Sequence, residues 1–120
     1  MRRLILLGVL FLLVGLIFPG CGGTTTTPTP TPTATPISGQ ANVNISGFAF
    51  VPQTLRVAVG TRVTWTNNDS VNHTITSQDN LFDSGTISKG ATFSYIFNQS
   101  GTFEYHCKIH PSMTGKIIVE

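Results

Sequence analysis

The chain has 120 residues, of which only 10% are charged, and its formal net charge at pH 7 is +2. This length accommodates one small domain with attached segments. Two of the seven basic residues, Arg2 and Arg3, lie at the N-terminus, and beyond residue 20 five basic residues balance five acidic ones. No basic stripe is present, which excludes a nucleic-acid-binding footprint. No stretch after residue 20 repeats apolar residues at the helical period, so we expect an all-β domain.

Residues 1–20 have the pattern of an export signal. Arg2 and Arg3 precede an apolar run from Leu4 to Phe18. That run is shorter than the about 20 residues that span a bilayer comfortably. Small residues follow it, as they do at cleavage sites of signal peptides. We therefore predict a signal peptide over residues 1–20 and an exported, extracytoplasmic protein.

The first cysteine, Cys21, ends a Phe-Pro-Gly-Cys sequence that resembles the lipobox of bacterial lipoproteins. The resemblance implies lipidation of Cys21 and a membrane anchor at the cell surface or in the periplasm. Phe18 stands where the pattern usually has Leu, so ordinary cleavage and an uncleaved anchor remain alternatives. No disulfide with Cys107 is expected, since Cys21 lies in a Gly-rich junction and Cys107 lies within metal-ligand spacing.

A Thr/Pro-rich segment over residues 24–36 continues from the predicted anchor. Proline disfavours helix in the residue before it, so this segment is expected to be an extended spacer on the order of 40 Å long. Its composition also suits O-glycosylation. We assign residues 21–39 to the anchor and linker, with a disordered tail as the alternative.

Short alternating segments separated by turn residues fill residues 40–120. Such spacing predicts seven to eight strands in a Greek-key β-sandwich. The residues expected to face inward are Val43, Ile45, Leu55, Val57, Val59, Val63, Trp65, His73, Ile75, Ser77, Phe93, Tyr95, Phe97, Phe103, Tyr105 and Cys107.

Four potential metal donors stand out in this domain. Cys107, His110 and Met113 follow one another at three-residue steps on a loop between two predicted strands. His73 lies upstream and should point inward because it shares a strand face with Ile75. Singly, a Cys or a Met is usually a core residue. Together, two His and one Cys with a weak axial Met form the ligand set of a blue-copper electron-transfer site.

The Cys-x2-His-x2-Met loop resembles that of the cupredoxins, most of all amicyanin and related plastocyanin-like proteins. The run from Phe50 through Trp65 to His73 resembles plastocyanin-like domains too, and the resemblance covers roughly residues 41–120. It implies one type 1 copper ion, cycling between Cu(I) and Cu(II). Cys107 would supply the strong thiolate bond, His73 and His110 the nitrogens, and Met113 the long axial contact. No position then remains for a substrate, so an electron carrier and not an enzyme is expected.

The family also implies that electrons pass through the exposed edge of the loop histidine, here His110. Pro111, Ile109 and, as a further candidate, Phe50 would surround it with an apolar patch suited to weak, transient contact of a monomer with redox proteins. Thr74 follows His73 where several members have Asn, and it either braces the ligand loop or is an ordinary strand residue. The alternatives to electron transfer are a copper storage or delivery module and a metal-free adhesion domain.

Overall fold

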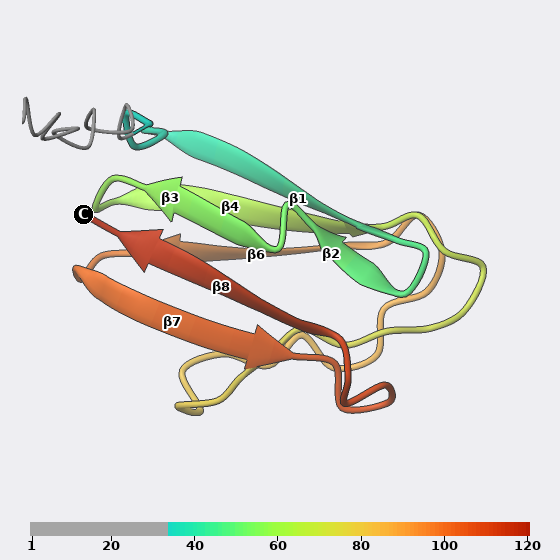
Figure 1. Cartoon of the computed structure of the whole chain (residues 1–120). Coiled ribbons are helices and arrows are strands. Elements are labelled where there is room, and N and C mark those ends of the chain that lie inside the picture. Colours follow the sequence, from blue (N-terminus) through green and yellow to red (C-terminus); the bar gives the residue numbers. More distant parts are fainter. Residues whose placement is uncertain (1–33) are drawn as a thin grey trace, which may run out of the picture. The chain divides into compact units, whose positions relative to one another are not determined.

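Two four-stranded β-sheets pack face to face in the computed structural model, which describes residues 34–120 (Figure 1). The strands of one sheet, in spatial order, are β2 (Ala49–Val51), β1 (Gln40–Ser46), β4 (Thr61–Asn67) and β6 (Thr92–Phe97). Those of the other are β3 (Thr54–Val57), β8 (Thr114–Val119), β7 (Gly101–His106) and β5 (Thr76–Ser77). β1 pairs with β4 and β3 with β8 in parallel, and the other neighbours are antiparallel. The predicted all-β Greek-key sandwich is confirmed, with eight strands.

The core lies between the sheets and is filled by the alternating inward residues. In β1, Val43 and Ile45 are fully buried, and Ile117 faces them from β8 with no exposed area. Each such side chain contributes roughly 1.5–3 kcal/mol by its removal from water. Trp65 of β4 is also fully buried and packs against four other rings at centroid distances of 5.4 to 6.4 Å. Those rings belong to Phe82, Phe93, Phe97 and Tyr105.

The alternation stops after β3, and the prediction of an inward Val59 is wrong. The Val59 side chain is 50% exposed, and β3 ends at Val57. Gly60 has a φ of +89°, which only glycine adopts without steric cost. The chain turns here to leave one sheet for the other, so the two-residue period of a strand no longer applies.

The segment that carries His73 is covered on both faces. His73, Ile75 and Ser77 are buried as predicted, but so are the two residues between them. The segment around Ser84 covers one of these faces and is bonded to Ile75. The Ile75 N–H donates to Ser84 Oγ at 2.8 Å, and the Ser84 N–H donates to the Ile75 carbonyl at 2.9 Å. Only Thr76–Ser77 pairs in the sheet as β5, so the predicted strand is shorter than expected.

Three connections meet at the end of the sandwich that lies away from the C-terminus (Figure 1). They are the β1–β2 turn, the segment after β4, and the loop over residues 107–113 between β7 and β8. Parallel pairing of β1 and β4 places the ends of these two strands together. Segments far apart in the sequence therefore meet around one site.

Several predictions lie outside the described residues, namely the signal peptide, lipidation of Cys21 and the first part of the linker. Within residues 34–120, no helix is long and apolar enough to cross a bilayer.

Candidate metal centre

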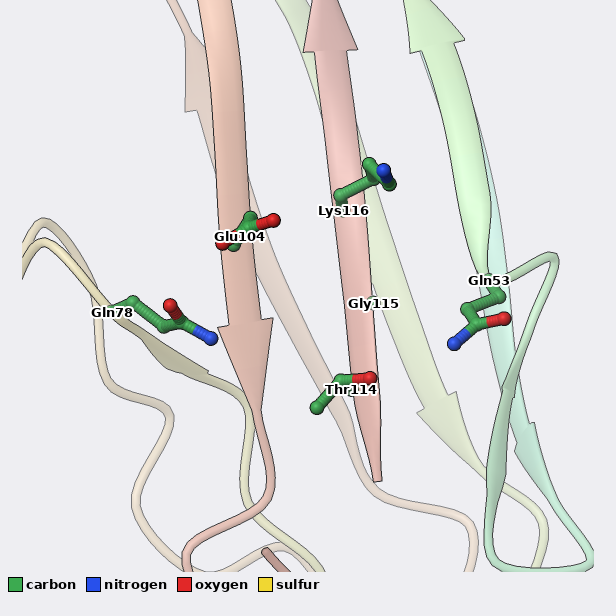
Figure 2. Close-up of a pocket in the computed structure, with 6 residues that line it drawn as sticks. All are labelled: Gln53, Gln78, Glu104, Thr114, Gly115 and Lys116. Carbon is green, nitrogen blue, oxygen red and sulfur yellow. The ribbon is translucent and has the colours of Figure 1, made fainter. Parts of the chain in front are cut away.

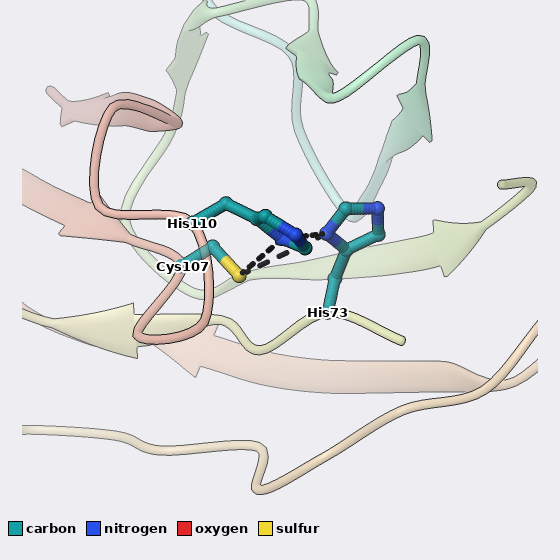
Figure 3. Close-up of side chains that lie close together, drawn as sticks. All are labelled: His73, Cys107 and His110. Carbon is teal, nitrogen blue, oxygen red and sulfur yellow. Dashed lines mark hydrogen bonds between the residues drawn. The ribbon is translucent and has the colours of Figure 1, made fainter. Parts of the chain in front are cut away.

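Three of the four predicted donors converge at the end where the connections meet. Cys107 Sγ lies 3.8 Å from His73 Nδ1 and 3.8 Å from His110 Nδ1, and the two nitrogens lie 3.2 Å apart (Figure 3). His73 and Cys107 have no exposed area, and His110 is partly exposed. In the described part of the chain, this is the group of His, Cys and acidic residues with the spacing to hold a metal ion.

The dimensions of this triangle suit a single metal ion. A point equidistant from the three donor atoms lies about 2.1 Å from each, which is close to usual metal–nitrogen and metal–sulfur bond lengths. Neutral imidazoles and a thiolate arranged in this way favour copper or zinc. The residues present therefore fit the copper ion implied by the sequence.

Met113 is the fourth predicted donor and closes the loop that carries the others. Its N–H donates to the His110 carbonyl at 2.9 Å, and its carbonyl accepts from the Cys107 N–H at 3.1 Å. The side chain is only 3% exposed. These bonds make the loop a closed turn at the site, and the Met113 side chain that it carries is buried.

Asp69 orients His73. Its Oδ2 lies 2.9 Å from His73 Nε2. When Nε2 carries the proton, it donates to this carboxylate and leaves the Nδ1 lone pair facing Cys107 and His110, as outer-shell partners of metal-binding histidines do. The turn containing Asp69 is itself held, since its N–H donates to Oδ1 of the buried Asn67 at 3.0 Å.

The same carboxylate holds the β1–β2 turn. It accepts the Gly47 N–H at 2.7 Å and the Phe48 N–H at 2.9 Å. The bond from Phe48 is the largest cause that lowers the pKa of Asp69, with Gly47 and His73 adding to it against the effect of burial. Asp69 is not among the site residues predicted from the sequence. Its position four residues before a predicted ligand histidine was the available signal.

Thr74 braces the ligand loop, which is the first of the two roles expected for it. Its hydroxyl accepts the Lys108 N–H at 2.8 Å, and its own N–H donates to Cys107 Sγ at 3.3 Å. Hydrogen bonds to sulfur stabilise the thiolate form, which is the form that binds metal.

Phe48, and not Phe50, is the aromatic residue beside His110. The Phe48 ring meets the His110 ring edge-on, with centroids 5.0 Å apart, and is 52% exposed. Phe50 is 2% exposed and packs inside against Tyr105, so its predicted place in the surface patch is wrong. Inward and outward positions alternate along β2, and the exposed contact falls to the turn residue instead.

The lysine within the ligand loop, Lys108, is neutralised by an acidic partner. Lys108 forms an ion pair with Asp83. The hydrogen bond from Lys108 is the main reason that the pKa of Asp83 is lowered. The loop surface around His110 therefore gains little net charge from Lys108.

A hollow of about 310 Å³ lies on the outer face of β7 and β8, away from the donors (Figure 2). Polar side chains flank it, among them Glu104 and Lys116 on neighbouring strands. None of the four predicted donors lines it, so it is separate from the centre described above. The full lining is Gln53, Gln78, Glu104, Thr114, Gly115 and Lys116.

Comparisons with known proteins show which family and which structures this chain resembles. Residues 22–119 match the family model for the cupredoxin-like domain. Amicyanin-alpha of Methylorubrum extorquens is 31% identical over 88 residues, which is 69% of this chain and 74% of that protein. A purple cupredoxin from Nitrosopumilus maritimus is 34% identical, with a TM-score of 0.64 over 67% of this chain and 99% of that one. A Cu(I) form of an amicyanin variant is 31% identical, with a TM-score of 0.65 over 68% and 83% of the two chains.

Proposed function

Because the chain belongs to the cupredoxin-like family, we propose that it is a type 1 (blue) copper protein that carries single electrons between redox partners. One observation supports this above all others. A thiol sulfur and two imidazole nitrogens form a triangle with sides of 3.8, 3.8 and 3.2 Å at the end of the sandwich.

In this proposal the ligands are His73, Cys107, His110 and Met113. Bound copper would supply a one-electron Cu(I)/Cu(II) couple. Sulfur donors suit Cu(I), and imidazole suits both oxidation states, so one donor set serves both. The protein holds these donors through Asp69, Thr74 and the closed loop, which favours little rearrangement between the two states.

The burial of the donors favours electron transfer over catalysis. His73 and Cys107 are 0% exposed and Met113 is 3% exposed, so His110 is the donor residue with substantial access to solvent. A substrate would need an open coordination position, as catalytic metal sites provide. An electron needs only a short path through the His110 ring edge.

The surface around His110 supports weak contact with redox proteins. Phe48 and Ile109 are 52% and 48% exposed, and Pro111 is exposed next to them in the loop. A small patch of this kind fits the transient encounters of electron-transfer proteins, which bury less area than stable complexes. We propose that the protein acts there as a monomer.

We also propose export and anchoring at the outer face of the membrane through lipidated Cys21. The supporting observation is the lipobox-like sequence before Cys21 and the Thr/Pro-rich segment after it. Replacing Cys21 with Ser should move the protein from the membrane fraction to the soluble fraction. A Cys21→Ser protein that stays with the membrane would favour an uncleaved anchor.

The test of copper function is a visible spectrum of the protein after addition of Cu(II), then of ascorbate, then of an oxidant. We expect a strong thiolate–copper charge-transfer band that ascorbate bleaches and the oxidant restores. The matched control, Cys107→Ser, should be colourless with an unchanged far-ultraviolet circular dichroism spectrum. An equally coloured control would refute the ligand assignment. A protein that binds copper but surrenders it during cycling would favour storage or delivery.

A further inference from the structure

We infer that Phe48 is a fixed cover over the metal centre, which Asp69 clamps in place and which excludes water and competing small ligands from the donors. The inference rests on the proposed copper function and adds a specific role within it. It explains how the centre would retain its ion while one of its ligands, His110, approaches solvent.

The first observation is the position of the Phe48 ring. It contacts both histidines edge-on, with its centroid 5.5 Å from that of His73 and 5.0 Å from that of His110. The interplanar angles are 88° and 90°. Edge-to-face pairs of aromatic rings are favourable, so the ring has a defined place although half of it is exposed. It shields the two imidazoles on the side where β1 turns into β2.

The second observation is the backbone that presents this ring. Phe48 has a φ of +58°, in the left-handed region that a bulky residue rarely adopts. Glycine, or to a lesser degree Asn or Asp, would form this turn at lower cost. An unfavourable conformation of this kind persists where surrounding bonds impose it, and it often marks a functional position.

The third observation is the clamp itself. Asp69 receives the N–H groups of Gly47 and Phe48, and the same carboxylate lies 2.9 Å from His73 Nε2. The placement of the cover and the orientation of one ligand thus depend on a single side chain. Asp69 is a positioning residue for both.

The fourth observation is open space next to the cover. A hollow of about 150 Å³ is lined by Phe48 on the turn and by the buried Met113 of the ligand loop. The Phe48 ring separates this hollow from the two imidazoles that it contacts, so loss of the ring would extend the hollow toward them. Water and small chelators would then reach the donors more readily.

The test compares Phe48→Gly with wild type and with Val51→Ala in the full chain. Glycine accepts the left-handed φ, so Phe48→Gly removes the ring without straining the turn. Val51 is a suitable control, because it lies in the same hairpin and is 50% exposed. Thermal unfolding of each variant verifies that the fold is intact.

Two rates are measured. In the metal-free protein, the alkylation of Cys107 by iodoacetamide is followed by mass spectrometry of the peptide that contains it, so that Cys21 does not contribute. In the copper-loaded protein, transfer of Cu(I) to bathocuproine disulfonate is followed by absorbance. We expect Phe48→Gly to raise both rates by about tenfold or more, and Val51→Ala to leave both near wild type. Asp69→Ala should also raise the alkylation rate, because it releases the turn that carries Phe48 while the ring is still present; its copper transfer is not compared, since Asp69 also bonds His73.

Alkylation at the wild-type rate in Phe48→Gly would overturn the inference that Phe48 covers the centre. Faster alkylation with unchanged copper transfer would overturn its role in retaining the ion. The alkylation measurement uses no metal, so it tests whether Phe48 blocks access to Cys107 even if the chain were to bind no copper. Conversely, a coloured, redox-active protein with unchanged alkylation would leave the proposed function standing and remove only this inference.

Discussion

The backbone N–H of Thr74 points at Cys107 Sγ across 3.3 Å, although 33 residues separate the two in sequence. The Thr74 hydroxyl accepts the N–H of the next loop residue, Lys108, at 2.8 Å. The ligand loop is therefore bound to the His73 segment through one residue that serves both as a donor to sulfur and as a brace for the backbone.

Replacing Thr74 with Val should weaken this brace and leave the N–H bond to sulfur in place. The Lys108 N–H loses its acceptor, so we expect the free energy of unfolding to fall by about 1–2 kcal/mol. Copper colour should persist with a shifted band. Denaturant unfolding and visible spectra measure the two effects. Thr74→Ser keeps the hydroxyl and should behave as wild type, and equal losses in both variants would contradict the brace.

Replacing Met113 with Leu should keep the copper colour and raise the reduction potential. The colour arises from the thiolate, whereas the axial ligand tunes the potential of such sites. An apolar group in place of the thioether favours the lower charge of Cu(I). Cyclic voltammetry measures the change, and Ile109→Leu on the exposed part of the same loop serves as the control. Loss of all copper binding in Met113→Leu would show that Met113 is more than a weak axial ligand.

Replacing Asp83 with Asn should reduce the loss of stability in acid. The ion pair with Lys108 lowers the pKa of Asp83 in the folded state. A lowered carboxyl pKa stabilises the protein above the unfolded-state value, and this contribution is lost as pH falls through the folded-state value. The free energy of unfolding of wild type should therefore decline below about pH 4.

Unfolding of the metal-free protein in denaturant at pH 6 and at pH 3 tests this expectation. Asp83→Asn should lose less stability between the two pH values than wild type. Asp79 makes no ion pair within residues 34–120, so Asp79→Asn is the matched control and should follow wild type. An unchanged acid response in Asp83→Asn would contradict the role of this pair.

Replacing Gly115 with Ala should destabilise the sheet. Gly115 lies opposite Tyr105 in the β7–β8 pair, and a Cβ there would come within 2.5 Å of the Tyr105 ring. Tyr105 is fully buried and cannot move aside easily. We expect a loss of about 1–3 kcal/mol in the free energy of unfolding, as for other overpacked cores. Lys116→Ala, on the exposed side of the same strand, should cost much less, and an equal effect in both variants would refute the steric explanation.

Local pattern was sufficient for much of the fold. Alternation in β1 and β4 predicted the buried faces that contain Val43 and Trp65, because strand side chains point to opposite sides in turn. The prediction was wrong at Val59, where a turn between sheets ends the alternation. Around His73, alternation correctly predicted the burial of His73 and Ile75 but did not predict that of Thr74 between them, because chain covers both sides of this segment.

The donor types were predictable from the sequence, since three of them share one short loop and the inward direction of His73 follows from its neighbour Ile75. The surroundings of these donors depend on the tertiary structure. Asp69 and Thr74 act through hydrogen bonds to segments 21 to 34 residues away in the chain, such as the clamp on the β1–β2 turn, and Phe48 contacts His110 across a still longer interval. Such contacts depend on strand register and on how the connections pack at one end of the sandwich. A short sequence pattern specifies neither the register nor this packing, because both depend on how the whole core is buried.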